Sequence, residues 1–181
     1  MSRHQGRALL AIAIAMLSIF SRCPKQPFVK YHQMSQQSFH FSPDVIINFE
    51  VDGEGPRPLL MLHGFGASLE SWKDIQPYLR TNFRVYALDL KGHGLSSKPH
   101  DNKYSPQDQA DIVTAFIKNR QLTDVVLVGH SYGGGVALLA FLRLSEHTEH
   151  NPVSTMILID SASYPQPLPF FCRQPSTTSI E

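Results

Sequence analysis

Short apolar runs alternate with polar segments along the middle of the chain. Such runs, rich in Val, Leu and Ile, lie at residues 59–62, 84–88, 125–128 and 155–160. Runs of this length and composition predict strands that are buried on both faces of a sheet. Residues 45–51 end in a Gly- and Pro-containing turn cluster and predict a further strand, beside which we expect residues 38–41 to pair at the sheet edge.

Helical patterns fill the spaces between these runs. Apolar residues recur on one face of residues 69–79, where we expect Trp72 to lie in the core. The Ser-Pro-Gln-Asp segment at 105–108 is typical of a helix N-terminus and predicts a helix to about Arg120. A further helix is expected to end at Glu146. Strands that alternate with helices predict an α/β fold, with a mostly parallel sheet and helices on both faces.

The chain has 181 residues, of which 42% are hydrophobic and 17% charged, as in a single globular domain. Its ends differ from its middle. We expect residues 1–27 to be a signal peptide or membrane anchor with the start of a linker, and 28–42 to be linker and edge strand. The folded domain is expected at 43–170, and 171–181 is expected to be a disordered polar tail.

The N-terminal segment has the features of an export signal. Arg3 and Arg7 precede a largely apolar stretch at 8–20, which is shorter than the roughly 20 residues of a membrane span. No Ala-x-Ala cleavage site follows, and Arg22 before Cys23 argues against a lipoprotein site. A removed signal, an uncleaved anchor and a start codon upstream of the true domain remain open. The first two predict an extracytoplasmic or membrane-anchored domain, by a bacterial-type route, with 8–20 contacting the membrane.

Charge and residue spacing exclude several functions. The formal net charge is +1 and no basic run is interleaved with aromatics, so we expect no nucleic-acid partner. The nine histidines show no zinc spacing; His147 and His150 could share a helix face, but two ligands do not make a site. We expect no metal and no cofactor. Cys23 and Cys172 form no Cys-x-x-Cys motif and have no paired base, so neither is a nucleophile candidate.

The strongest candidate for a catalytic motif is Gly-His-Ser-Tyr-Gly at 129–133, between an apolar strand and a helical run. A Gly-x-Ser-x-Gly in this context predicts a nucleophile elbow. Gly129 and Gly133 lack a Cβ, so strand and helix can approach closely. Ser131 is expected to have a positive φ or to fall in another sparsely allowed region. The backbone N–H of Tyr132, in the first helical turn, can donate to a developing oxyanion.

Two other motifs precede this one. His-Gly-Phe-Gly follows an apolar strand at 63–66, and Asp-Leu-Lys-Gly-His-Gly-Leu-Ser-Ser occupies 89–97. Together with Gly-His-Ser-Tyr-Gly-Gly at 129–134, these motifs resemble those of the α/β-hydrolase superfamily, in its serine-nucleophile branch. The resemblance covers about 43–170 and implies an α/β-hydrolase fold that lacks its C-terminal third.

The resemblance also implies roles for single residues. The backbone N–H of Phe65 would be the second oxyanion donor, with Gly64 as a loop glycine. His63 would shape the loop rather than act as the base. Asp89 would serve turn geometry and is not predicted to be catalytic.

The general base is the missing part. A serine nucleophile needs a base that a carboxylate orients, and in this family acid and histidine follow the serine. After Ser131 the sequence holds only His147 and His150, which lie about 20 Å away at the far end of the elbow helix. Neither can reach the serine. Asp160, at the end of the next strand, is a candidate for the acid because some family members place it there.

Two hypotheses from different classes follow. In the first, the protein is a serine hydrolase that cleaves an ester or similar acyl bond of a small molecule through an acyl-Ser131 intermediate. This chain would then be an inactive fragment, because no histidine suited to be the base follows the elbow helix. In the second, it is a non-catalytic, membrane-tethered binding module. A strained serine favours the first. Serine at 131 argues against epoxide hydrolase or dehalogenase chemistry, which uses aspartate there in this superfamily.

Overall fold

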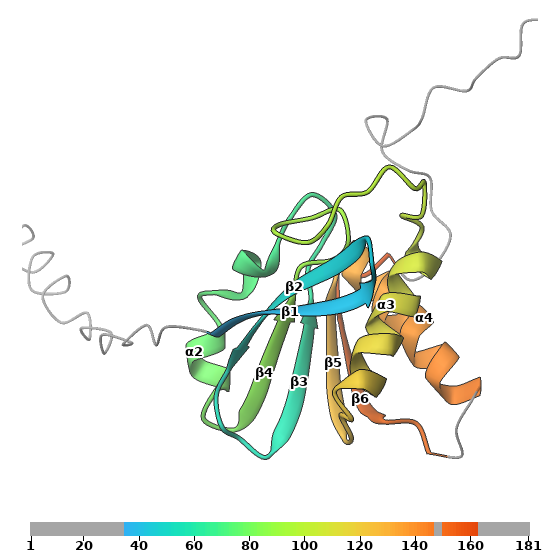
Figure 1. Ribbon diagram of the computed structural model, residues 1–181. Helices are drawn as coiled ribbons and strands as arrows, with labels where there is room; N and C mark the ends of the chain where they lie inside the picture. The colour runs from blue at the N-terminus through green and yellow to red at the C-terminus, as the bar shows by residue number, and fades with distance from the viewer. Residues whose placement is uncertain (1–34, 147–149, 163–181) are drawn as a thin grey trace, which may run out of the picture. The chain divides into compact units, whose positions relative to one another are not determined.

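The computed structural model describes residues 35–146 and 150–162 (Figure 1). They form a six-stranded sheet in the order β1-β2-β4-β3-β5-β6. The strands are β1 Ser35–Ser42, β2 Val45–Asp52, β3 Arg57–Leu62, β4 Phe83–Leu88, β5 Val125–His130 and β6 Val153–Ile159. The helical elements are the 3₁₀ helix η1 Leu69–Trp72 and the α-helices α2 Gln76–Leu79, α3 Pro106–Asn119 and α4 Tyr132–Glu146.

The sheet is mostly parallel, as the alternation of strands and helices predicts. β4, β3, β5 and β6 run parallel, whereas β1 and β2 join antiparallel at one edge. β3 lies directly beside β5, with Leu62 opposite Gly129. The two strands that carry the His-Gly-Phe-Gly and Gly-His-Ser-Tyr-Gly motifs are thus neighbours that end at the same sheet edge.

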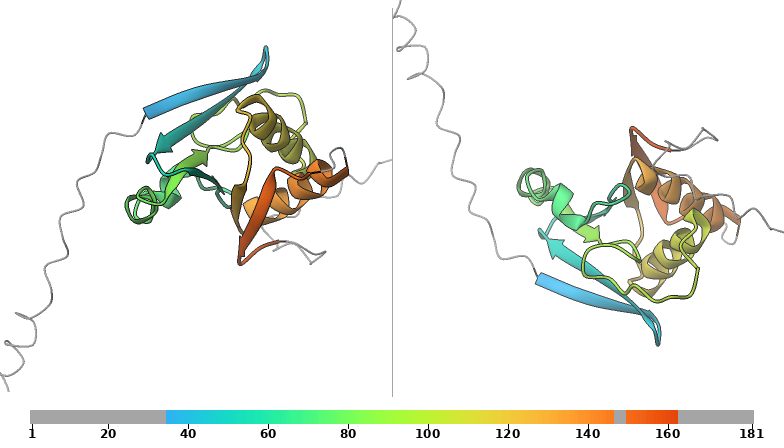
Figure 2. Two further views of the ribbon diagram at one scale, coloured as in Figure 1. Left: turned by 90° about the horizontal axis from the view of Figure 1, so that it is seen from below. Right: turned by 90° about the horizontal axis from the view of Figure 1, so that it is seen from above.

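Helices cover both faces of the sheet, as Figure 2 shows from two directions. Strand residues alternate between the two faces, so Leu60 packs in the core under α3 and α4 while Leu59 packs in the core under η1. Phe116 of α3 contacts the Phe49 ring edge-on at 5.0 Å in the larger core. Trp72 lies in the smaller core with 7% of its surface exposed, which confirms its predicted burial.

The single helix predicted over 69–79 is wrong. The segment divides into η1 and the four-residue α2, and Ile75, expected on the buried face, is 47% exposed. Pro77 gives the physical reason. In a continuous helix its ring would clash with the carbonyl four residues earlier, so a new helix begins at Gln76 with proline in its first turn.

The other boundaries shift by a few residues. β1 begins at Ser35, ahead of the predicted start at 38, and β6 covers Val153–Ile159 rather than 155–160. Asp160 is therefore the first residue after the strand. α3 and α4 end where the sequence predicts, near Arg120 and at Glu146.

Several predictions lie outside the described residues. They concern the apolar stretch at 8–20, the tail at 171–181, Cys23, Cys172 and His147. Within 35–146 and 150–162, no helix is both long enough and apolar enough to cross a lipid bilayer.

Candidate active site

Ser131 occupies a strained turn between β5 and α4. Its φ is +51°, which confirms the predicted positive value. Its N–H donates to Ile159 O at 2.9 Å, and its carbonyl accepts from Gly134 N and Ala162 N, both at 3.0 Å. The Ser131 backbone is thus hydrogen-bonded to the end of β6 and to the segment after it, which holds the serine in this conformation.

The close approach of strand and helix depends on two glycines. A Cβ at Gly129 would lie 2.5 Å from both Gly133 O and Gly134 Cα. A Cβ at Gly133 would lie 2.4 Å from His63 O and 2.5 Å from Leu62 O. These distances are shorter than any van der Waals contact, so the Gly-x-Ser-x-Gly spacing is a packing requirement of this turn.

The 63–66 loop lies against the serine turn. A Cβ at Gly64 would be 3.0 Å from His130 Nδ1 and 3.4 Å from the Ser131 Cβ. The Phe65 ring is 69% exposed and meets the Tyr132 ring edge-on at 6.0 Å. The loops that carry the two predicted oxyanion donors, Phe65 and Tyr132, are therefore neighbours. Their donor roles stay predictions.

His63 is engaged through both ring nitrogens. It is fully buried; Nδ1 donates to Gly64 O at 2.8 Å, and Nε2 accepts from Leu90 N at 3.0 Å. Burial lowers the pKa of His63, which keeps the ring neutral as this bonding pattern requires. The geometry agrees with the predicted loop-shaping role, because no ring nitrogen is left to accept a proton from Ser131.

Asp89 is a buried hub that joins strand β2, the start of η1 and the loop after β4. Oδ1 accepts from Leu69 N at 2.8 Å, and Oδ2 accepts from Leu95 N and from Asn48 Nδ2, each at 2.8 Å. It is 1% exposed. All of these contacts are structural, in agreement with the predicted turn-shaping role.

Within residues 35–146 and 150–162, no histidine that follows Ser131 in the chain lies beside it. His150 precedes β6, whose first residue, Val153, pairs with Val125 at the opposite end of the sheet from the serine. Its predicted distance from the site is thus supported by the topology. Asp160 directly follows β6 at the serine edge, with an exposed side chain and a φ of +43°. Its position suits the acid, but no contact with a histidine is present in the part of the chain that the structure describes.

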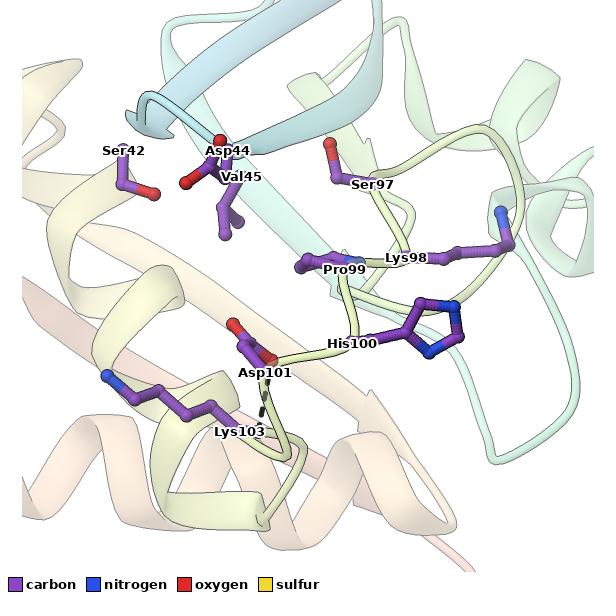
Figure 3. Close-up of a pocket in the computed structure, with 9 residues that line it drawn as sticks. All are labelled: Ser42, Asp44, Val45, Ser97, Lys98, Pro99, His100, Asp101 and Lys103. Atoms are coloured by element: carbon purple, nitrogen blue, oxygen red, sulfur yellow. Dashed lines mark hydrogen bonds between the residues drawn. The ribbon is translucent and has the colours of Figure 1, made fainter.

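A cavity of about 460 Å³ adjoins Phe65 and Tyr132. Its other walls come from the segment that follows β4 and include His93, Lys98 and Tyr104. Sequence reasoning missed these three residues: the 89–97 motif, which contains His93, was interpreted only as a turn, and Lys98 and Tyr104 lie outside it. A larger and more open hollow of about 670 Å³ lies on the other side of this segment, next to the β1–β2 turn (Figure 3).

Metal ligands do not gather in the described part of the chain. Nowhere in residues 35–146 and 150–162 do three His, Cys, Asp or Glu side chains come together as a metal ion would need. The arrangement offers instead a half-buried serine at the sheet edge, the neighbouring 63–66 loop and an adjoining aromatic cavity.

The family follows from comparison with known proteins. A family model described as "alpha/beta hydrolase fold" matches residues 57–175. The chain belongs to the alpha/beta hydrolase fold family. The matched region contains the serine turn, the 63–66 loop and the Asp89 hub.

Individual relatives include hydrolases. The chain is 40% identical over 90 residues to the dihydrolipoyllysine-residue acetyltransferase component of an acetoin cleaving system from Pseudomonas putida, covering 50% of this chain and 24% of that protein. It is 32% identical over 114 residues to 2-hydroxymuconate semialdehyde hydrolase from Pseudomonas sp. (strain CF600), covering 61% and 38%. A solved alpha/beta hydrolase fold protein from Burkholderia ambifaria superposes with a TM-score of 0.66 at 31% identity, covering 77% and 50%. The chain thus spans half or less of each of these proteins.

Proposed function

We propose that this protein is a serine hydrolase that cleaves an ester or a similar acyl bond of a small molecule. The observation that carries the proposal is the positive φ of Ser131, in a turn where Gly129 and Gly133 admit no side chain. Strain of this kind costs about 1–3 kcal/mol and persists where function requires it. A binding module would gain nothing from it, so the non-catalytic hypothesis has less support.

The proposed reaction begins with attack of Ser131 Oγ on the acyl carbon. The Oγ–C bond forms, the Oγ proton passes to a general base, and the N–H groups of Phe65 and Tyr132 hold the oxyanion. Collapse breaks the bond to the leaving alcohol, which takes the proton from the base. Water then hydrolyses the acyl-serine by the same steps, and the free serine returns. Relatives that are hydrolases, such as the semialdehyde hydrolase, support this class of reaction.

The proposed base is a histidine that follows the elbow helix α4, and among the described residues only His150 does so. His63 is committed to its loop, and His150 is at the opposite sheet edge. We therefore propose that this chain by itself does not turn over substrate. Asp160 is the proposed acid, to be paired with a histidine that another segment would supply.

The test is hydrolysis of a short-chain p-nitrophenyl ester by the wild-type chain and by Ser131→Ala. We expect equal, background rates, and Ser131-dependent activity once a C-terminal segment carrying a further strand and a histidine is fused or added in trans. The control is the same segment with its histidine replaced by alanine. Ser131-dependent turnover by the chain alone would show that a base is already present. No activity in any complemented form would count against the hydrolase.

We further propose that residues 8–20 direct the chain out of the cytoplasm or anchor it at the membrane. The apolar stretch after Arg3 and Arg7 supports this proposal. Expression of the chain with a C-terminal reporter, followed by fractionation, tests it. Recovery of all protein in the cytoplasmic fraction, unchanged when 8–20 is deleted, would refute it.

A further inference from the structure

The cavity beside the serine turn has an aromatic wall. Phe65, Tyr104 and Tyr132 all line it. The Tyr132 hydroxyl donates to Tyr104 O at 3.1 Å, and burial raises the pKa of Tyr132 to about 12, so this wall stays uncharged. Phe65 is a large ring left 69% exposed at the cavity mouth. An exposed aromatic ring that continues an apolar wall favours contact with a flat, apolar ligand.

Lys98 gives the same cavity a cationic side chain. Lys98, His93 and His100 line it, and no Asp or Glu is among its described lining residues. Figure 3 shows the Lys98 and His100 side chains pointing away from Ser42 and Asp44, although both residues also line the larger hollow. Lys98 therefore borders both cavities, but only the smaller one also has the aromatic wall.

The Lys98 ammonium is held in place. Nζ donates to Gly94 O at 2.6 Å and to Ser96 O at 3.1 Å. An ammonium carries three N–H donors, so one remains for a ligand. The nearest acidic residue in sequence, Asp101, is turned to Lys91, whose Nζ lies 2.8 and 2.6 Å from its two carboxylate oxygens. Its charge is thus matched by Lys91 and not by Lys98.

We propose that this cavity binds the acyl half of the substrate, and that this half carries a flat apolar group together with a carboxylate. The rings of Phe65 and Tyr132 contact the apolar group, and Lys98 pairs with the carboxylate. Tyr132 directly follows Ser131, so a ligand in the cavity lies next to the serine turn. That the bound part is the acyl half of a substrate rests on the proposed function, whereas binding of an anion in the cavity does not.

The experiment compares two probes that differ only in charge. The 181-residue chain is titrated with 4-phenylbutyrate and with its neutral amide, and chemical-shift changes in amide NMR spectra give both dissociation constants. A hydrogen bond to a charged partner predicts about tenfold tighter binding of the acid. Lys98→Met should abolish this preference and Lys98→Arg should keep it. Lys118→Met removes the same charge at the far end of α3 and should also keep it.

The outcomes separate this proposal from the catalytic one. Equal binding of acid and amide, a preference that survives Lys98→Met, or no saturable binding would each overturn it. Dispersed spectra of Lys98→Met show that the variant is folded. Ser131→Ala should bind phenylbutyrate like the wild type, because the cavity does not include Ser131. Binding that persists while complemented chains show no hydrolysis would refute the hydrolase and leave the anion site standing.

Discussion

At the scale of single residues, the strain at Ser131 is the feature that distinguishes this turn from an ordinary one. A left-handed conformation costs a non-glycine residue about 1–2 kcal/mol, and Ser131 adopts it with a φ of +51°. The cost is met by the hydrogen bonds that its backbone makes to Ile159, Gly134 and Ala162. Glycine would adopt the same φ without strain, so the stability of a glycine variant relative to an alanine variant measures the strain.

Ser131→Gly should therefore be more stable than Ser131→Ala, by about 0.5–1 kcal/mol in urea unfolding. The same pair of substitutions at Thr114, in the middle of α3, is the control. There alanine should be the more stable by about 1 kcal/mol, because glycine weakens a helix interior. An alanine variant at 131 that equals or exceeds the glycine variant would contradict the strained turn.

At the scale of elements, α3 shows how a local signal defines a boundary. Ser105 Oγ accepts from Asp108 N at 3.2 Å, and Asp108 Oδ2 accepts from Ser105 N at 2.9 Å, which makes a capping box. Ser105→Ala should lower the free energy of unfolding by about 1 kcal/mol. Ser105→Asn, which can still cap, should lower it by clearly less. Equal losses in thermal or urea unfolding would show that the cap does not matter here.

The segment after β4 has its own stabilising contact. Lys91 is 2% exposed, and its ammonium bonds Asp101 and lies 4.6 Å from the centre of the Tyr104 ring. This hydrogen bond holds the pKa of Asp101 below its ordinary range. A carboxyl with a lowered folded pKa stabilises the fold above its ordinary pKa of about 3.9 and loses that contribution as the pH falls through the folded value.

Asp101→Asn should therefore be less stable than the wild type at neutral pH, and the difference should shrink as the pH falls below about 4. Urea midpoints measured over this range give the comparison. Asp74→Asn, which removes an equal charge from an exposed position, controls for net charge. A difference between wild type and Asp101→Asn that does not change with pH would contradict the role of the ion pair.

At the scale of the whole molecule, β6 is the exposed edge of the described sheet. Ile157, Leu158 and Ile159 are 44%, 37% and 40% exposed, on a strand that pairs only with β5. An apolar edge strand favours pairing with another chain. We expect concentration-dependent self-association in sedimentation, reduced by Ile157→Lys. Leu142→Lys, on the exposed face of α4, should leave the self-association unchanged. An equal reduction by both substitutions would show that any added surface charge raises the solubility.

The local pattern of the sequence sufficed for the strands, for the cap of α3 and for the turn at Ser131. Each depends on neighbours in the chain: apolar runs bury strands, Ser105 and Asp108 bond within one turn, and Gly129 and Gly133 flank the serine. The prediction of a single helix over 69–79 failed for a local reason too. It followed the apolar spacing and gave too little weight to Pro77.

The sequence by itself determined the fold class and the serine turn, because both follow from periodicity and from short motifs whose geometry is local. Only the tertiary structure decided what lies around Ser131. It brought Gly64 and Phe65 beside the turn, committed both nitrogens of His63, and formed a cavity from Lys98, Tyr104 and Tyr132. These contacts join segments far apart in the chain. They depend on the strand order β4-β3-β5 and on loop packing, which no local pattern encodes.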